Sequence, residues 1–338
     1  MTTPLEALIS THRSDPPRLA FRGSTESDFA QWHAELRTKF EALLGLPRMA
    51  ELWTSQPEVR EEPAEDLGDH LRQKMYLKTT PDYWLPFYVL RPKGAGPFIP
   101  IVAQHGHGET GARGVIGLPK TDEEREEIRS LNYSYGLDAV RRGYIVFAPD
   151  KRGFGETRDF ANACGFIASA AISLGLTMIG MHTWDNIRLL DYIAAHRDCR
   201  NGPIGAIGLS GGGGGTMWLS AMDDRIGATV ISGHLASFAA NSGIFACVCN
   251  AVPGILTWAD RGEVGGLTAP RPLLIESASD DACYSRAATL DAYEAVKRIY
   301  AAAGVSDRTD IDLFEGAHAW SGAKAWQFLK KWLAEDKQ

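Results

Sequence analysis

Cysteine is scarce in this chain of 338 residues, and its five cysteines are scattered. A disulfide framework needs more cysteines at closer spacing, so none is expected. The only close pair, Cys247 and Cys249, has no second pair of ligands at the spacing of a zinc finger. We therefore expect buried, reduced thiols, no metal and no organic cofactor. The five cysteines are Cys164, Cys199, Cys247, Cys249 and Cys283.

The chain also has no excess of basic residues, because 35 Lys and Arg stand against 42 Asp and Glu, a net charge of −7. Basic faces bind nucleic acids and anionic membranes, so neither partner is expected. The most apolar stretch, from Phe238 to Trp258, is broken by polar residues and Pro253 and is no membrane span. The N-terminus lacks the pattern of a signal peptide. These absences predict a soluble, cytoplasmic protein, and they leave its oligomeric state, monomer or homo-oligomer, open.

What the chain has is a regular alternation of strand-like and helix-like segments beyond residue 70. Such alternation predicts an α/β fold with a mostly parallel central sheet and helices on both faces. The predicted helices are 131–142, 184–196, 217–222, 287–303 and 323–333. The predicted strands are 74–79, 83–91, 98–103, 144–148, 204–207, 229–231, 271–275 and 310–314.

Two parts of the chain are expected, a helical and peripheral extension over residues 1–70 and one α/β domain over residues 71–338. In the extension, apolar residues recur at three- and four-residue steps from Phe29 to Leu44, which predicts an amphipathic helix. Gly45 and Pro47 follow and are expected to end that helix.

Two stretches of the α/β domain, residues 155–180 and 235–262, fit the alternation poorly. Both are apolar, contain glycines and follow strands. We expect them to be cap-like insertions over the carboxyl ends of the strands, where ligands bind in open α/β folds.

Ser210 stands in the frame Gly208-Leu209-Ser210-Gly211-Gly212, directly after the apolar run 204–207 and before a predicted helix. A Gly-x-Ser-x-Gly frame between a strand and a helix is typical of a nucleophile elbow, a turn that strains the serine backbone. Glycine is needed on both sides because a Cβ there would collide with the neighbouring strand and helix. Ser210 is therefore the predicted nucleophile.

A serine hydroxyl becomes a good nucleophile when a histidine, oriented by a carboxylate, takes its proton. In elbow-type folds the chain order is serine, acid, histidine. Of the two histidines after Ser210, His318 lies in the loop between the last strand and the last helix, where it can lean over the elbow. His234 is disfavoured, because the only carboxylates between it and Ser210, Asp223 and Asp224, precede the intervening strand.

The acid should follow the strand 271–275, where Asp280 and Asp281 stand side by side. Adjacent side chains point in different directions, so only one of the two carboxylates can face the imidazole of His318. Spacing alone does not choose between them.

Acyl transfer also needs two N–H donors for the oxyanion, one of them directly after the nucleophile at Gly211. The other should come from the loop after the third strand, and we expect the backbone N–H of His107. The side chains of His105 and His107 have a rival interpretation as metal ligands. No carboxylate or cysteine stands near them at ligand spacing, so that interpretation is disfavoured.

Together these motifs resemble the α/β-hydrolases, and more narrowly the dienelactone-hydrolase-like and acetyl-xylan-esterase-like branch. The resemblance covers residues 75–335 and includes a helical N-terminal extension. The acid loop of the family commonly reads Gly-x-x-Asp-Pro, which aligns with residues 278–282 and favours Asp281, although Ala278 and Ala282 depart from the pattern. The motifs that carry the resemblance are His105-Gly106-His107-Gly108, Asp150-Lys151-Arg152-Gly153-Phe154-Gly155-Glu156, Gly208 to Gly212, Pro270 to Glu276 and Gly316-Ala317-His318.

The expected reaction is hydrolysis of a carboxylic ester, with a small acyl group implied by the resemblance, through an acyl-serine intermediate. Ser210 attacks, His318 relays the proton, and Asp281 orients the imidazole. The backbone N–H groups of Gly211 and His107 stabilise the oxyanion. The expected partner is a small-molecule ester.

Three alternatives are weaker. Gly106 to Gly111 matches the Gly-x-Gly-x-x-Gly of dinucleotide-binding folds, but the residues that follow cannot sustain the required helix. A prolyl-oligopeptidase-like peptidase shares the elbow and the triad, but no propeller-type repeats precede the domain. A non-catalytic binding scaffold is disfavoured because serine, acid and histidine all stand in order.

Overall fold

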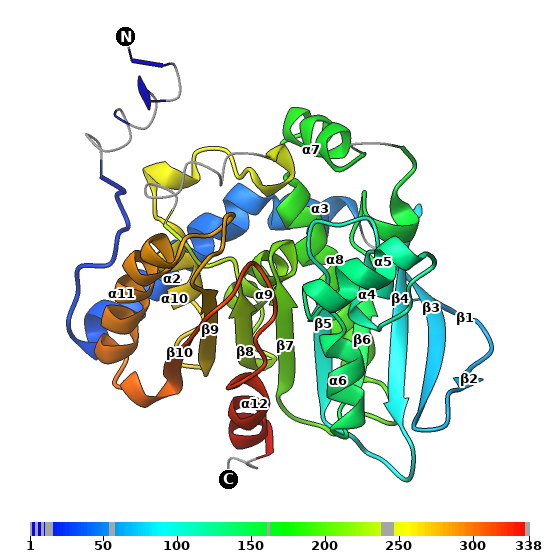
Figure 1. Cartoon of the computed structure of the whole chain (residues 1–338). Helices are drawn as coiled ribbons and strands as arrows, with labels where there is room; N and C mark the ends of the chain where they lie inside the picture. Colours follow the sequence, from blue (N-terminus) through cyan, green and yellow to red (C-terminus); the bar gives the residue numbers. More distant parts are fainter. Residues whose placement is uncertain are drawn as a thin grey trace.

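The computed structural model describes residues 2–3, 6–7, 10, 16–53, 58–160, 163–237 and 247–334 (Figure 1). Its centre is a twisted sheet with the strand order β1-β3-β4-β6-β5-β7-β8-β9-β10, and β2 pairs with β3. Neighbouring strands are parallel from β6 to β10 and antiparallel from β1 to β6. The strands are β1 (Val59–Glu61), β2 (Glu65–Asp66), β3 (His70–Thr80), β4 (Tyr83–Pro92), β5 (Pro100–Gln104), β6 (Ile145–Pro149), β7 (Ile204–Leu209), β8 (Ile226–Ser232), β9 (Leu273–Ala278) and β10 (Thr309–Phe314).

All eight predicted strands are present, with ends shifted by a few residues. The central strands β5, β6, β7 and β9 are buried along their whole length. Strands covered on both faces tolerate a continuous apolar run, and that run is the signal from which they could be predicted. The predicted α/β fold with a mostly parallel sheet is confirmed.

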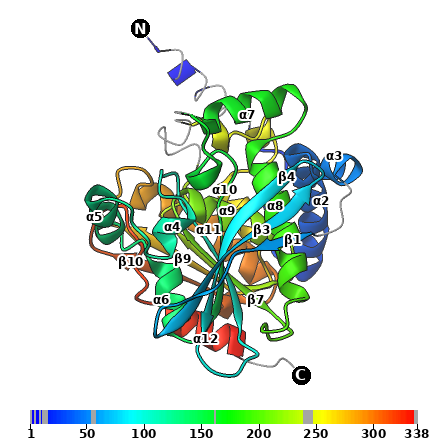
Figure 2. The ribbon, with the colours of Figure 1, turned by 90° about the vertical axis from the view of Figure 1, so that its right-hand side faces the viewer.

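Helices cover both faces of the sheet (Figure 2). The helices α6 and α12 bury Val140 and Leu329 against one face, and α2, α8, α9 and α11 bury apolar residues on the other. The helices are α2 (Glu26–Leu44), α3 (Leu46–Leu52), α4 (Ala112–Val115), α5 (Asp122–Ser130), α6 (Tyr135–Arg141), α7 (Ala163–Ser173), α8 (Met178–Ala194), α9 (Gly211–Met222), α10 (Arg261–Gly266), α11 (Arg286–Ala302) and α12 (Ala325–Ala334). Short 3₁₀ turns are η1 (Gly155–Thr157), η3 (Val248–Asn250), η4 (Ile255–Thr257) and η5 (Ser306–Arg308).

The N-terminal extension agrees with the expectation in part. Its helix α2 is amphipathic, as predicted, because Leu36 and Phe40 are fully buried, Phe40 packs edge-on against Trp218 of α9, and the opposite face of the helix is exposed. The extension is not wholly helical, since β1 and β2 lie within residues 1–70. Gly45 ends α2 in a left-handed conformation, as predicted, but Pro47 opens α3 instead of stopping a helix.

The two predicted insertions lie together above the carboxyl ends of the central strands (Figure 1). The first contains η1 and α7, and the second contains η3 and η4, while its residues 238–246 lie outside the described part. No single described helix is long and apolar enough to cross a membrane. Only α7 and α8 taken as a pair have that length and composition, and they are bent by 96°.

Candidate active site

A tight turn joins β7 to α9 at Ser210. Its backbone, at φ 61° and ψ −125°, lies where residues with a Cβ are rarely found. Its N–H donates to the carbonyl of Ser232 at the end of β8, which holds the turn against the neighbouring strand. The side chain is only partly buried, at the N-terminus of the 12-residue helix α9. This is the predicted strand–serine–helix elbow, at the edge of the sheet where the parallel strands end.

The glycines around Ser210 are required by close backbone contacts. A Cβ at Gly208 would lie 2.4 Å from the carbonyl carbon of Gly212, and a Cβ at Gly212 would lie 2.0 Å from the carbonyl oxygen of Gln104 on β5. Both obstacles are backbone atoms that cannot rotate away. The turn therefore packs against β5 at a distance that only glycine allows.

Replacing Gly212 with alanine should destabilise the fold by at least about 1–3 kcal/mol, because the added methyl group forces the elbow away from β5. Urea unfolding followed by circular dichroism measures this loss. The matched control is Gly108→Ala, because a Cβ at Gly108 would come no closer than 3.5 Å to a neighbouring side chain, and this variant should be about as stable as the wild type. Equal stability of the two variants would show that the elbow does not pack this tightly.

The loop after β5 lies directly over the elbow. A Cβ built on Gly211 would lie 3.1 Å from the backbone nitrogen of His107, so these two residues face each other beside Ser210. The loop is held from behind, because the hydroxyl of Tyr133 accepts the N–H of Gly106. Both predicted oxyanion donors are thus on the same side of the serine.

His105, the rival metal ligand of the sequence analysis, is a structural residue. Its ring is fully buried, and its Nε2 accepts the backbone N–H of Lys151 at 2.9 Å. Its Nδ1 must then carry the proton, which it donates to the carbonyl of Gly106 at 2.8 Å. Burial, with a contribution from the charge of Lys151, holds the pKa of His105 well below its ordinary value. Its two nitrogens are both used in holding the loop.

His318 and Asp281 form a pair at the neighbouring strand ends. The Nδ1 of His318 lies 2.7 Å from the Oδ2 of Asp281, and the other carboxylate oxygen accepts the N–H groups of Cys283 and Tyr284 at 2.8 Å each. The side chain of Asp281 is 1% exposed and that of His318 is 20% exposed. Asp280 is exposed instead and accepts a hydrogen bond from Ser279. The geometry therefore singles out Asp281 from the adjacent aspartates.

The His318 ring lies next to the end of β7. A Cβ built on Gly233, the residue after β8, would lie 3.0 Å from a ring carbon of His318 and 3.2 Å from a methyl group of Leu209. The ring also stacks on Tyr284, with centroids 5.9 Å apart. The hydroxyl of Ser210 makes no hydrogen bond to any described residue in this conformation. A hydrogen bond between Ser210 and His318 would form only on side-chain rotation or on binding of a ligand, and catalytic hydrogen bonds often tighten in that way.

His234, the disfavoured candidate base, is buried beneath the elbow helix. A Cβ on Gly214 would lie 2.6 Å from its ring, and the ring centroid lies 5.0 Å from that of Tyr284. Burial, reinforced by the charge of Arg261, keeps its pKa well below the ordinary value. The neutral ring fills the space under α9.

Lys151 has a buried side chain. The sequence indicated this residue only as part of a motif that carries the family resemblance, and predicted no role for it. Its Nζ donates to the carbonyl of Gly211 at 3.0 Å, one residue from the nucleophile. Burial lowers its pKa to about 7. Asp150, next to it, accepts the N–H groups of Ala112 and Glu156, and burial raises its pKa to about 6. Lys151 fixes the first turn of α9, so it positions the N–H of Gly211.

Glu276, on β9, holds the loop that carries His318. Its two carboxylate oxygens accept the N–H groups of Ser321 and Gly322, at 3.2 and 2.9 Å. The side chain is fully buried, which raises its pKa to about 7. The carboxyl group therefore takes up a proton in the folded protein at a higher pH than in the unfolded chain.

This raised pKa makes Glu276 a source of stability at low pH. The contribution is fully present below about pH 4.5 and is lost as pH rises through 7, by up to about 3 kcal/mol. Glu276→Gln stays neutral, so its stability relative to the wild type should rise by that amount between pH 4.5 and 8. Urea unfolding at several pH values measures the difference. The control is Glu315→Gln, an exposed residue in the loop that carries His318, whose stability relative to the wild type should not change with pH. If the stability of Glu276→Gln relative to the wild type did not change with pH either, the raised pKa of Glu276 would be contradicted.

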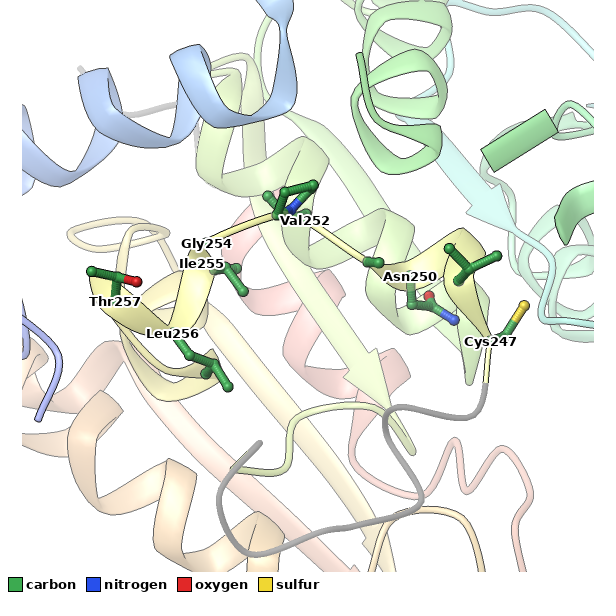
Figure 3. Close-up of a pocket in the computed structure, with 10 residues that line it drawn as sticks. Cys247, Asn250, Val252, Gly254, Ile255, Leu256 and Thr257 are labelled. Carbon is green, nitrogen blue, oxygen red and sulfur yellow. The ribbon is translucent and has the colours of Figure 1, made fainter. Parts of the chain in front are cut away.

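Three cavities are lined by residues of the insertions. One of about 20 Å³ is lined by His107, Lys151, Gly211 and Cys249, among others. A second of about 250 Å³ lies on the other side of His107, against Phe154 and α7. The segment from Cys247 to Thr257 lines a third, mostly apolar pocket of about 400 Å³ (Figure 3). Residues of both insertions therefore line the cavities next to His107.

Known proteins share this architecture. YtaP of Bacillus subtilis (strain 168), named “Putative hydrolase YtaP”, is 28% identical over 315 residues, 89% of this chain and 99% of YtaP. A “putative acetyl xylan esterase” from Bacteroides fragilis NCTC 9343 superposes with a TM-score of 0.78 at 17% identity, over 99% of this chain and 91% of that one. A glucuronoyl esterase from Solibacter usitatus gives a TM-score of 0.70 at 16% identity, over 93% and 96% of the chains. At these identities the two structures are evidence for the fold alone.

A family model places the chain more firmly. The model of the Abhydrolase family matches residues 9–245, more than half of the chain, including the extension, the loop after β5 and the elbow. The strand order of the sheet, the serine elbow and the family match all indicate the same fold. The chain belongs to the Abhydrolase family and has the α/β-hydrolase fold.

Proposed function

We propose that this protein is a serine hydrolase that cleaves carboxylic esters through an acyl-serine intermediate. The observation that carries the proposal is the meeting of three strand ends. Ser210, strained at φ 61°, follows β7, the paired Asp281 follows β9, and its partner His318 follows β10. Nucleophile, base and orienting acid can act in sequence only when they converge in this way.

Each residue then has one task. Ser210 attacks the ester carbonyl, and its proton passes to Nε2 of His318, which later protonates the leaving alkoxide. Asp281 holds the proton on Nδ1, so that Nε2 is left free to accept. The N–H groups of Gly211 and His107 stabilise the oxyanion, while Lys151 and Tyr133 hold those two donors in place. A water molecule then attacks the acyl-serine by the same steps.

Short-chain esters of sugars or other small alcohols are the proposed substrates. Support comes from the names of the structural neighbours, which include acetyl xylan and glucuronoyl esterases. The peptidase alternative lacks this support, because the structural neighbours named above are esterases.

An ester panel tests the proposal. Nitrophenyl esters of graded acyl length, an acetylated sugar and a peptide amide are offered to the purified protein. We expect turnover of the acetyl and other short esters, falling with acyl length, and none of the amide. Faster cleavage of the amide would favour a peptidase, and the absence of all turnover would favour a binding scaffold.

A further inference from the structure

Four ligand-type side chains meet beside the oxyanion loop. His107 comes from the loop after β5 and Cys164 from the first turn of α7, while Cys249 lies in the turn η3 and Cys247 directly precedes it. The imidazole nitrogen and the three sulfur atoms all lie within 4.8 Å of one another. Cys164 and His107 are 83 and 140 residues from Cys247 in the chain, so no local spacing indicated the cluster.

The distances between these atoms suit a tetrahedral metal. Zinc lies about 2.3 Å from thiolate sulfur and 2.0–2.1 Å from imidazole nitrogen, which places neighbouring ligand atoms about 3.5–3.8 Å apart. The Nε2 of His107 lies 3.3 Å from the sulfur of Cys247 and 3.5 Å from that of Cys164, and those two sulfur atoms are 3.9 Å apart. The sulfur atoms of Cys247 and Cys249 are 2.9 Å apart and need to separate by about 1 Å.

We propose that His107, Cys164, Cys247 and Cys249 form a binding site for Zn²⁺. Three thiolates and one imidazole complete a four-coordinate shell, which is typical of structural zinc sites. Each thiol releases its proton to solvent as its sulfur–zinc bond forms. The proposal replaces the expectation that these cysteines are no more than buried thiols and that the chain holds no metal.

The surroundings of the four residues fit this role. The side-chain amide of Asn250 donates to the sulfur of Cys249 at 3.6 Å, the type of contact that orients a metal-bound thiolate. Three thiolates with Zn²⁺ carry a net charge of −1, and the buried amine of Lys151 lines the same small cavity as Cys249 and His107. In Figure 3 the Cys247 side chain points away from the Ile255–Thr257 end of its segment.

The location indicates what the metal would do. His107 is the residue whose backbone nitrogen faces Gly211, whereas Cys164 and the Cys247–Cys249 pair belong to the two insertions. Zinc would therefore tie both insertions to the loop over the elbow. Because a ligand that binds only the folded state stabilises it, added zinc should raise the melting temperature of the metal-free protein.

Metal binding can be measured without any enzymatic reaction. The reduced, metal-free protein is loaded with Zn²⁺, passed through gel filtration and weighed by native mass spectrometry, and Co²⁺ loading is followed through its thiolate charge-transfer absorption. We expect one zinc per chain and a thiolate–cobalt band. Cys164→Ser and Cys249→Ser should weaken binding at least tenfold. Cys199→Ala, which removes a buried thiol outside the cluster, should bind as the wild type does.

Ser210→Ala should also bind one zinc, because the metal site does not include the serine. Loss of ester hydrolysis therefore tests the proposed function, and loss of zinc binding tests the metal site. Circular dichroism establishes that each variant is folded. The proposal is overturned if the folded wild-type protein retains no zinc, or if the folded Cys164→Ser and Cys249→Ser variants bind zinc as tightly as the wild type.

Discussion

Ser210→Ala should lower the turnover of a short-chain nitrophenyl ester by at least about four orders of magnitude. Alanine keeps the shape of the elbow but removes the only oxygen that can form the acyl-enzyme. The backbone strain at this position and the helix behind it remain, so the fold should be unaffected. The comparison is made on kcat/KM, with melting temperatures recorded for both proteins.

Ser130→Ala, on the exposed surface of α5, provides the matched control and should keep full activity. If Ser210→Ala retained more than about one hundredth of the wild-type activity, another residue would have to be the nucleophile.

Asp281→Asn should lower turnover by about four orders of magnitude, whereas Asp280→Asn should change it by less than about twofold. The Oδ2 of Asp281 faces Nδ1 of His318 at 2.7 Å, and its Oδ1 is held by two backbone N–H groups. An amide placed there presents its nitrogen to His318, because its oxygen is needed by those N–H groups. The proton of His318 then moves to Nε2, where it blocks acceptance from Ser210.

The two adjacent variants make this test sharp. They remove the same charge from the same loop, but only Asp281 is buried and faces the imidazole. A larger loss in Asp280→Asn than in Asp281→Asn would move the acid to position 280, and equal small losses would remove the acid from the mechanism.

The parts of this protein that could be predicted from sequence are those that local sequence patterns determine. The buried strands appear as unbroken apolar runs, because both faces of the sheet are covered. The elbow appears as a glycine frame because Gly208 and Gly212 touch backbone that a Cβ would displace. The strand ends that carry Asp281 and His318 followed from the order of these elements.

What could not be predicted depends on contacts between distant segments. The amphipathic pattern predicted α2 but not the surface against which it packs, because the contact of Phe40 with Trp218 joins distant segments. Spacing left Asp280 and Asp281 open and only the family resemblance favoured Asp281, because the residue that faces His318 is decided by which carboxylate the folded loop buries. His107, Cys164 and Cys247 come from three segments that lie far apart in the sequence, so no local spacing indicated that they meet.

The central claim is that the hydroxyl of Ser210, activated by His318, is the nucleophile. The most direct measurement is peptide mapping of the protein after reaction with a fluorophosphonate, which traps an activated serine. The account predicts one adduct per chain, on the peptide that contains Ser210, with much slower labelling of His318→Ala. An adduct on a different residue, or ester turnover that persists without any adduct, would contradict it.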